Sequence, residues 1–289
     1  MVSLAEALEF EPAAVRELAR SAARRYRKLL LPRPGRAPRE IDAPDDELKA
    51  AQRRLLKRLI VRLPVSRRAH GFVPGRSAVT GAREHAGREL VVTFDLRDFF
   101  PSVKAAAVRA IAADLALSGE DAADFVRLTT LRGRLPQGAP TSPALANLAF
   151  RRCDGRLGGL ADSLGLAYTR YADDLAFSGG PEAGRIAGSV RSILAEDGFR
   201  LAAEKTRVMR RSERQEVCGL VVNDGVKLPR EARRRLRAVL HDVSRRGFAA
   251  AARGRGEGFP EWLAGHLAYL AAVDAAEAER LVALLDGPT

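Results

Sequence analysis

An acidic residue at the end of a strongly apolar run is the feature that most constrains this chain. Residues 90–96 are apolar except for Thr93 and Asp95, and they are rich in β-branched side chains, which predicts a buried β-strand. A carboxylate inside such a strand costs free energy unless it is paired or bound to a metal ion. The strand therefore marks Asp95 as a candidate functional residue.

A second acidic feature is the pair Asp173 and Asp174, at the tip of a β-hairpin that the pattern predicts over residues 166–178. If these carboxylates converge with Asp95, they repel one another until divalent cations neutralise them. Two-metal phosphoryl transfer requires an arrangement of this kind. Taken alone, the pair is weak evidence for function, because Asp pairs are common as solvated turn residues.

The charge balance of the chain favours a polyanionic partner. Its 289 residues include 49 Lys and Arg against 36 Asp and Glu, a net charge of +13, and 46% hydrophobic residues indicate a globular protein. The basic excess could also reflect an Arg-rich genomic composition. Two cysteines and four scattered histidines argue against a disulfide framework or a Cys/His metal cluster. Since no apolar run reaches the ~18 residues of a membrane span, we expect a cytoplasmic protein.

Hydrophobic periodicity and Pro/Gly punctuation predict the remaining elements. We expect basic amphipathic helices over residues 1–31, a Pro- and Arg-rich loop over 32–39, and a helix that Asp46 caps. Further helices are expected at 77–85, 104–116, 119–131, 144–164 and 182–197. Short strands are expected at 199–203, 206–210 and 215–222, and the pattern is helical from Arg230 onward.

Three ordered stretches carry a family resemblance. Residues 92–103 contain Asp95, residues 135–143 form a Pro/Gly-rich segment with Gln137, and residues 168–175 contain Tyr171-Ala172-Asp173-Asp174. Through them the chain resembles bacterial reverse transcriptases, particularly the retron-type branch. Shorter stretches that fit the same family are 52–54, 63–66, 69–77, 146–148, 204–206 and 219–223.

The resemblance implies an α+β right-hand polymerase with an antiparallel palm sheet, helical fingers and a helical thumb. The fingers would be residues 1–89, the palm 90–226 with a fingers insertion at about 105–137, and the thumb 227–289. No maturase or endonuclease domain is expected after the thumb.

The resemblance also implies the roles of the site residues. Asp95, Asp173 and Asp174 would hold two Mg²⁺ ions, which Mn²⁺ would be able to replace, with the Leu96 carbonyl as an extra ligand. Phe100 would exclude a ribose 2′-OH, or else pack in the core beside Phe99. The other expected nucleotide-binding residues are Arg33, Arg39, Gln137, Gly138 and Lys205.

Each of these has a physical reason and an alternative. A planar guanidinium at Arg39 or Arg33 can bind a triphosphate bidentately. Gly138 permits close backbone approach to the nucleotide. Lys205 would neutralise or protonate the leaving pyrophosphate, or it is a solvated lysine at the end of a strand.

Nucleic-acid contacts are expected from arginines in two regions. In the fingers region they would reach template phosphates, and in the thumb they would lie along the product duplex. The alternative is a solvated charged face. The residues are Arg67, Arg68, Arg76, Arg233, Arg234 and Arg237.

The implied function is RNA-directed DNA polymerase: addition of dNTPs to a 2′- or 3′-hydroxyl primer, in a retron enzyme that makes RNA-linked single-stranded DNA in antiphage defence. The partners would be a structured non-coding RNA, its DNA product, dNTPs and an effector protein, with no membrane. The chain has Val217-Cys218-Gly219 where retron enzymes typically carry Val-Thr-Gly, which leaves its cognate RNA open. The alternatives are an abortive-infection-like polymerase that makes DNA without an RNA template, and a non-catalytic nucleic-acid-binding scaffold.

Overall fold

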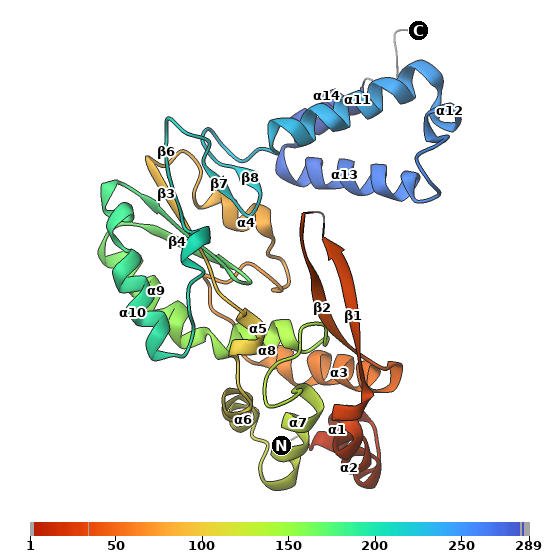
Figure 1. Ribbon diagram of the computed structural model, residues 1–289, viewed down its shortest axis with the longest axis vertical. Helices are drawn as coiled ribbons and strands as arrows, with labels where there is room; N and C mark the ends of the chain where they lie inside the picture. Colours follow the sequence, from red (N-terminus) through yellow and green to blue (C-terminus); the bar gives the residue numbers. More distant parts are fainter. Residues whose placement is uncertain (1–2, 34, 284, 286–289) are drawn as a thin grey trace.

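The computed structural model describes residues 3–33, 35–283 and 285, and Figure 1 shows their arrangement. A small sheet stands beside helices in the middle of the molecule. Short helices lie at one end and a group of C-terminal helices at the other, and a long hairpin rises from the short helices along the side opposite the sheet toward the C-terminal helices. Helices and antiparallel strands are mixed in this way in α+β proteins, so the expected fold class is confirmed.

The N-terminal segment differs from the expected run of helix. Helices α1 (Leu4–Leu8) and α2 (Pro12–Ser21) and a 3₁₀ turn (Ala22–Arg25) are followed by a β-hairpin of β1 (Tyr26–Arg33) and β2 (Arg36–Pro44). The apolar pattern fails as a helix signal after the 3₁₀ turn. Residues 29–31 are three successive exposed leucines, and three successive residues share no helical face. Cross-strand pairing decides their conformation instead. Pro34, part of the expected loop, lies outside the described residues.

Two helices follow the hairpin, and the segment between them contains Arg67, Arg68 and Arg76. In α3 (Asp46–Arg58) the cap is Asp45 rather than Asp46, since Asp45 Oδ1 accepts from the Leu48 amide at 2.9 Å. A short turn (Ile60–Arg62) follows. Helix α4 (Ala78–Arg83) lies within the expected range, with Ser77 at its N-terminus in a capping box.

The central sheet has four antiparallel strands in the order β4-β5-β3-β6. Its interior strand β3 (Leu90–Asp95) pairs with β5 (Asp174–Gly179) on one side and with β6 (Arg207–Arg210) on the other. Strand β4 (Ala167–Tyr171) completes the expected hairpin with β5. The strand expected at 199–203 is reduced to a single bridge between Leu96 and Leu201, because a 3₁₀ turn (Ala203–Lys205) follows directly. Strands β7 (Glu216–Val217) and β8 (Leu220–Val221) form a separate small hairpin.

Helices pack on the sheet, and further helices lie between the sheet and the N-terminal hairpin (Figure 1). The helix expected over 144–164 is two helices, because the chain leaves regular helical geometry at Phe150. Buried Phe94 and Phe177 of the sheet pack edge to face at 5.9 Å, in one core with Leu157 and Leu194. The helices are α5 (Phe99–Ser102), α6 (Ala105–Asp114), α7 (Gly119–Thr129), α8 (Ser142–Ala149), α9 (Arg151–Ser163) and α10 (Ala187–Glu196), with a 3₁₀ turn at Pro181–Arg185.

The C-terminal helices form a second core with the small β7–β8 hairpin and α4. Leu236, Leu240 and Val243 make the buried stripe of the long helix α11 at the spacing that the sequence predicts. None of the helices within the described ranges is both long and apolar enough to cross a bilayer. The four helices are α11 (Arg230–Arg246), α12 (Phe248–Ala252), α13 (Phe259–Val273) and α14 (Ala275–Val282).

Candidate active site

The sheet brings the three predicted carboxylates together at one end. Asp95 is the last residue of β3, and its antiparallel partner is Asp174, the first residue of β5. Asp173 lies in the two-residue turn between β4 and β5, and its carbonyl accepts from the Leu96 amide at 2.9 Å. Pairing between strands far apart in sequence therefore places all three residues at one edge of the sheet.

The electrostatics of this acidic cluster agree with its geometry. Desolvation and the neighbouring charges of Asp173 and Asp95 raise the pKa of Asp174 to about 6. Desolvation also raises the pKa of Asp173, and the charge of Asp95 adds to that shift, while Lys205 and Arg39 oppose it. The charge of Asp95 thus makes both Asp173 and Asp174 harder to ionise, and perturbed carboxylates of this kind are typical of functional sites.

Lys205 supplies part of that charge. Lys205 lies in the 3₁₀ turn that precedes β6, and its Nζ donates to Asp95 Oδ1 at a distance of 2.7 Å. Its side chain is more than half exposed and also forms an ion pair in the cluster. Its expected role toward pyrophosphate stays a prediction.

The chemistry of the donors fits a hard divalent cation. Carboxylate oxygens and a backbone carbonyl are the ligands that Mg²⁺ takes in proteins, and like-charged carboxylates gain most from such an ion. Over residues 3–33, 35–283 and 285, no three His, Cys, Asp or Glu side chains already stand in metal-binding geometry.

The acidic cluster opens into a cleft of about 830 Å³ that also contains most of the predicted nucleotide-binding residues. Arg33 and Arg39 enter it from the β1–β2 hairpin, which carries its basic side chains across the cleft from the sheet. Their convergence with the carboxylates could not be read from the expected loop, because the strand pairing of the hairpin determines it. The predicted residues that line the cleft are Arg33, Arg39, Asp95, Leu96, Phe100, Gln137, Asp173, Asp174 and Lys205.

Gly138 is required for a different contact from the one expected. Its φ is +135°, and a Cβ there would lie 2.6 Å from Ile41 Cγ2 and 2.7 Å from the Asp42 carbonyl oxygen. The Gln137 carbonyl accepts from the Asp42 amide at 2.8 Å. The close backbone approach at Gly138 therefore docks the Pro/Gly segment on β2, and contact with a nucleotide stays a prediction.

Phe100 stands at the edge of the core and not within it. Phe99 is 4% exposed, whereas Phe100 is half-buried and lines the cleft. The Phe100 ring lies 6.4 Å from Phe72, which itself lies 6.3 Å from Tyr171. Both phenylalanines border the cleft, but Phe99 is buried in the core while Phe100 keeps exposed surface there, as steric exclusion by Phe100 requires.

Several cleft residues escaped the sequence reasoning. Phe72 is half exposed and has a φ of +59°, which is a genuine outlier for a bulky side chain. Arg132 and Arg134 flank Gly133 and line the cleft just before the Pro/Gly segment. A search for basic or aromatic residues next to the recognised stretches is the signal that would have found them.

Arg67, Arg68 and Arg76, the residues expected to reach template phosphates, have partners within the chain. Arg67 and Arg68 both form ion pairs with Asp162 of α9. Arg76 donates through Nη1 to the carbonyls of Ser66 and Ala69, at 2.7 Å each. Arg76 thus shapes its own loop, and template contacts by the three residues stay a prediction.

The C-terminal arginines divide in the same way. Arg233 forms an ion pair of 3.3 Å with Glu277 of α14, a largely buried carboxylate. Arg234 and Arg237 are exposed on α11 and are available to a polyanion. The expected arginine run is therefore partly an internal tie between α11 and α14.

Comparisons with known proteins agree with this geometry. Residues 31–223 match the family described as reverse transcriptase (RNA-dependent DNA polymerase). The retron Mx65 reverse transcriptase of Myxococcus xanthus is 43% identical over 91% of this chain and 64% of its own length. The retron Ec86 reverse transcriptase of Escherichia coli is 33% identical over 73% of this chain and 67% of its own length. The chain thus spans about two thirds of the length of these relatives.

The fold has a solved counterpart. A telomerase from Candida albicans, solved with a fragment of telomeric RNA, matches with a TM-score of 0.50 over 89% of this chain and 56% of that one, at 11% identity. That likeness shows the fold, a right-hand polymerase arrangement built on an antiparallel sheet. With the matched family and the retron relatives, it means that the chain belongs to the reverse transcriptase family, in its bacterial retron-type branch.

Proposed function

We propose that this chain is an RNA-directed DNA polymerase that adds dNTPs to a primer hydroxyl. One observation carries the proposal: Asp95, Asp173 and Asp174 meet in a single cleft with Arg39, on which the incoming triphosphate would lie. Family membership implies divalent metal ions, and we assign two Mg²⁺ to the acidic cluster and the Leu96 carbonyl. When bound, such ions activate the primer hydroxyl and neutralise the transferring phosphate.

The residues around the cluster orient the substrates. Arg39 and Arg33 hold the triphosphate from the hairpin side of the cleft, since one guanidinium group can donate two parallel hydrogen bonds to phosphate oxygens. Phe100 occupies the space that a ribose 2′-OH would need. Lys205, beside Asp95, is placed to neutralise charge on the leaving pyrophosphate. The protein thereby contributes positioning and charge, which are the main terms in phosphoryl transfer.

We assign the fingers, palm and thumb to residues 1–89, 90–226 and 227–289. The hairpin β1–β2 belongs to the fingers in this division, and α11–α14 form the thumb, which would hold the template–product duplex. The retron relatives support a structured RNA as template and primer, and RNA-linked DNA as product. A role in antiphage defence with an effector protein is part of the same proposal.

Replacement of Asp173 by Asn tests the active site. Asp173→Asn should lower dNTP incorporation by more than about 1,000-fold, because charge stabilisation at the transferring phosphate is lost. Its Tm should stay within a few degrees of the wild type or rise, since the substitution relieves repulsion among carboxylates whose pKa is raised. Asp98→Asn is the matched control, because Asp98 lines the same cleft outside the acidic cluster. Full activity in Asp173→Asn with Mg²⁺ present would refute the site.

Omission of the RNA separates the proposed function from its rival. A reverse transcriptase makes no product without template, whereas an abortive-infection-like polymerase still extends DNA. Protein purified from its host should carry one dominant RNA, partly converted into DNA that is joined to it. Heterogeneous RNA with no linked DNA would argue against retron synthesis.

A further inference from the structure

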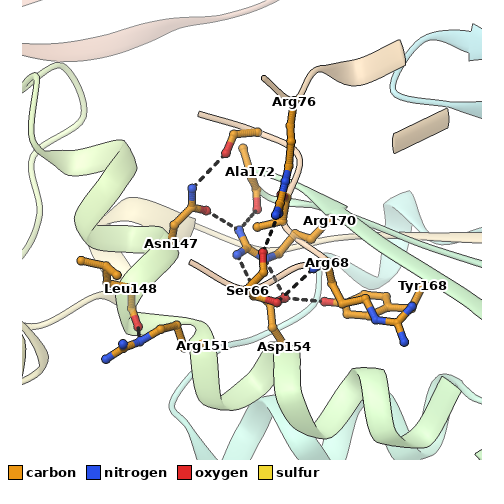
Figure 2. A network of polar contacts seen from close by, with 12 residues as sticks. Ser66, Arg68, Arg76, Asn147, Leu148, Arg151, Asp154, Tyr168, Arg170 and Ala172 are labelled. Atoms are coloured by element: carbon orange, nitrogen blue, oxygen red, sulfur yellow. Dashed lines mark hydrogen bonds and ion pairs between the residues drawn. The ribbon is translucent and has the colours of Figure 1, made fainter. Parts of the chain in front are cut away.

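A buried network of hydrogen bonds contacts the β4–β5 hairpin that carries Asp173 and Asp174, and Figure 2 shows it. At its centre is Arg170 of β4, which has no exposed surface. Arg170 donates through Nε and Nη2 to the two oxygens of Asp154 on α9, at 2.9 and 2.7 Å. The Tyr168 hydroxyl donates to the same carboxylate at 2.8 Å. This pair is the bidentate kind that fixes a guanidinium in one orientation.

The remaining Arg170 nitrogen reaches the catalytic turn. Nη1 donates to the Ala172 carbonyl at 3.2 Å and to Asn147 Oδ1 at 2.9 Å. Ala172 directly precedes Asp173 and has a φ of +54°, a left-handed conformation that costs free energy in a residue with a Cβ. A strained turn of this kind persists only where its surroundings hold it, and Arg170 holds its carbonyl.

Asn147 extends the network to Gly71, which lies against the turn. Asn147 lies on α8, the helix that follows the Pro/Gly segment, and its Nδ2 donates to the Gly71 carbonyl at 2.9 Å. Gly71 is pressed against the turn, since a Cβ there would lie 2.7 Å from the Ala172 amide nitrogen. Arg170 thus contacts the Ala172 carbonyl and Gly71 lies against its amide nitrogen, and Asn147 joins the two.

Stability alone does not explain a charged pair in this place. Burial of two charges removes them from water, and apolar residues of similar volume often serve a core equally well. The aromatic rings of Phe150 and Phe99, 4.6 and 5.8 Å from the Arg170 guanidinium carbon, would suit such a core. What the guanidinium adds is a set of directed hydrogen bonds onto the turn.

We propose that Arg170 is a positioning residue, which Asp154 orients and which holds the Ala172–Asp173 turn so that the acidic cluster keeps its working geometry. Asn147 couples this turn to α8 and Gly71, so that the metal-binding turn and the nucleotide pocket move as one unit. The inference rests on the proposed polymerase function for its kinetic consequences and on the hydrogen bonds alone for its structural ones.

Three variants of the full chain test the proposal. Arg170→Lys keeps a positive charge beside Asp154 but cannot reach Asp154, Asn147 and Ala172 together. Asn147→Ala leaves the ion pair intact and removes the link to Gly71. Thr169→Val is the matched control, because Thr169 lies on the same strand, and its buried hydroxyl contacts His85 and not the turn.

Single-nucleotide extension on a primed RNA template is the kinetic measurement. The maximal rate should fall about 100-fold in Arg170→Lys and about 10-fold in Asn147→Ala, because small misplacements of reacting groups have effects of this size. The apparent affinity for the dNTP should change less than about 3-fold, since the triphosphate contacts are untouched. Thr169→Val should stay within about 2-fold in both. Rates in Arg170→Lys and Asn147→Ala that match Thr169→Val would overturn the proposal.

Amide hydrogen exchange gives a readout that does not depend on catalysis. The Leu96 amide donates to the Asp173 carbonyl at 2.9 Å, so it reports whether the turn is held. Its exchange should be about 10-fold faster in Arg170→Lys and Asn147→Ala than in Thr169→Val, with the amides of α10 as internal reference. Unchanged exchange at Leu96 would refute the positioning role. If the wild type extends no primer, the polymerase proposal fails, and exchange at Leu96 still decides the role of Arg170. Should Arg170→Lys not fold, Asn147→Ala carries both measurements.

Discussion

The ammonium nitrogen of Lys205 lies 2.7 Å from Oδ1 of Asp95, across 110 residues of sequence. The ion pair joins the turn before β6 to the end of β3, and more than half of the lysine side chain remains exposed. A positive side chain thus engages one of the oxygens that we assign to metal binding. The ammonium and a divalent ion would compete for the same carboxylate.

Removal of this ammonium should strengthen metal binding. In Lys205→Met, the Mg²⁺ concentration for half-maximal dNTP incorporation should fall roughly two- to five-fold, the equivalent of an exposed ion pair of up to about 1 kcal/mol. A Mg²⁺ titration of primer extension measures this, with the exposed Lys57→Met as control. A higher Mg²⁺ requirement in Lys205→Met would show that the lysine supports the metal site.

Phe100→Ala should admit ribonucleotides. Because the ring lines the cleft, its loss should raise ribonucleotide over deoxynucleotide incorporation by at least about 10-fold in competition assays. Phe99→Leu is the matched control, since Phe99 is buried beside it and its truncation should cost stability without changing the ratio. An unchanged ratio in Phe100→Ala would assign its ring to packing alone.

Arg234 and Arg237, two of the exposed arginines of α11, should account for part of the salt dependence of RNA binding. Each phosphate contact contributes about 0.7–0.9 to the slope of log affinity against log salt, so Arg234→Ala with Arg237→Ala should flatten it by about 1.4–1.8. Arg233→Ala should leave the slope unchanged and lower Tm, because it leaves the largely buried Glu277 carboxylate without its partner. The same slope in the double variant and the wild type would place Arg234 and Arg237 on a solvated face.

The buried side chain of His85 should make the stability of the fold decrease at acidic pH. Its ring contacts the hydroxyls of Ser178 and Thr169 at 2.7 Å each, and desolvation lowers its pKa from 6.5 to about 3. Between these values the unfolded chain binds the proton and the folded chain does not, so stability falls as the pH falls. The contribution reaches about 1.4 kcal/mol per pH unit.

Urea unfolding between pH 7 and pH 4 measures this contribution. His85→Gln should reduce the pH slope of the unfolding free energy over that range, since the titrating group is gone. Thr169→Val should lower stability at every pH and retain the slope, because the imidazole remains. Identical slopes in wild type and His85→Gln would show that other groups cause the acid sensitivity.

Local patterns in the sequence predicted strand β3, the β4–β5 turn and the positions of the acidic residues on them. The apolar run up to Asp95 formed β3, and the hairpin with Asp173 at its turn formed where the alternation of residues predicted it. Such features depend on neighbours within a few residues, so the sequence pattern alone contains them. The ordered stretches with Asp95, Gln137 and Asp173 likewise placed the chain in its family, as the comparisons confirmed.

Only the tertiary structure decided which side chains meet. The β1–β2 hairpin replaced the end of an expected helix and an expected loop, because its strands pair with each other and dock on Gln137 and Gly138, contacts that no local pattern encodes. Lys205 reached Asp95, and Arg170 became a buried partner of Asp154, through packing between elements distant in sequence. A charged residue looks the same in a sequence whether it faces water or a carboxylate. Long-range pairing and desolvation decide which it is, because they exist only once the chain has folded.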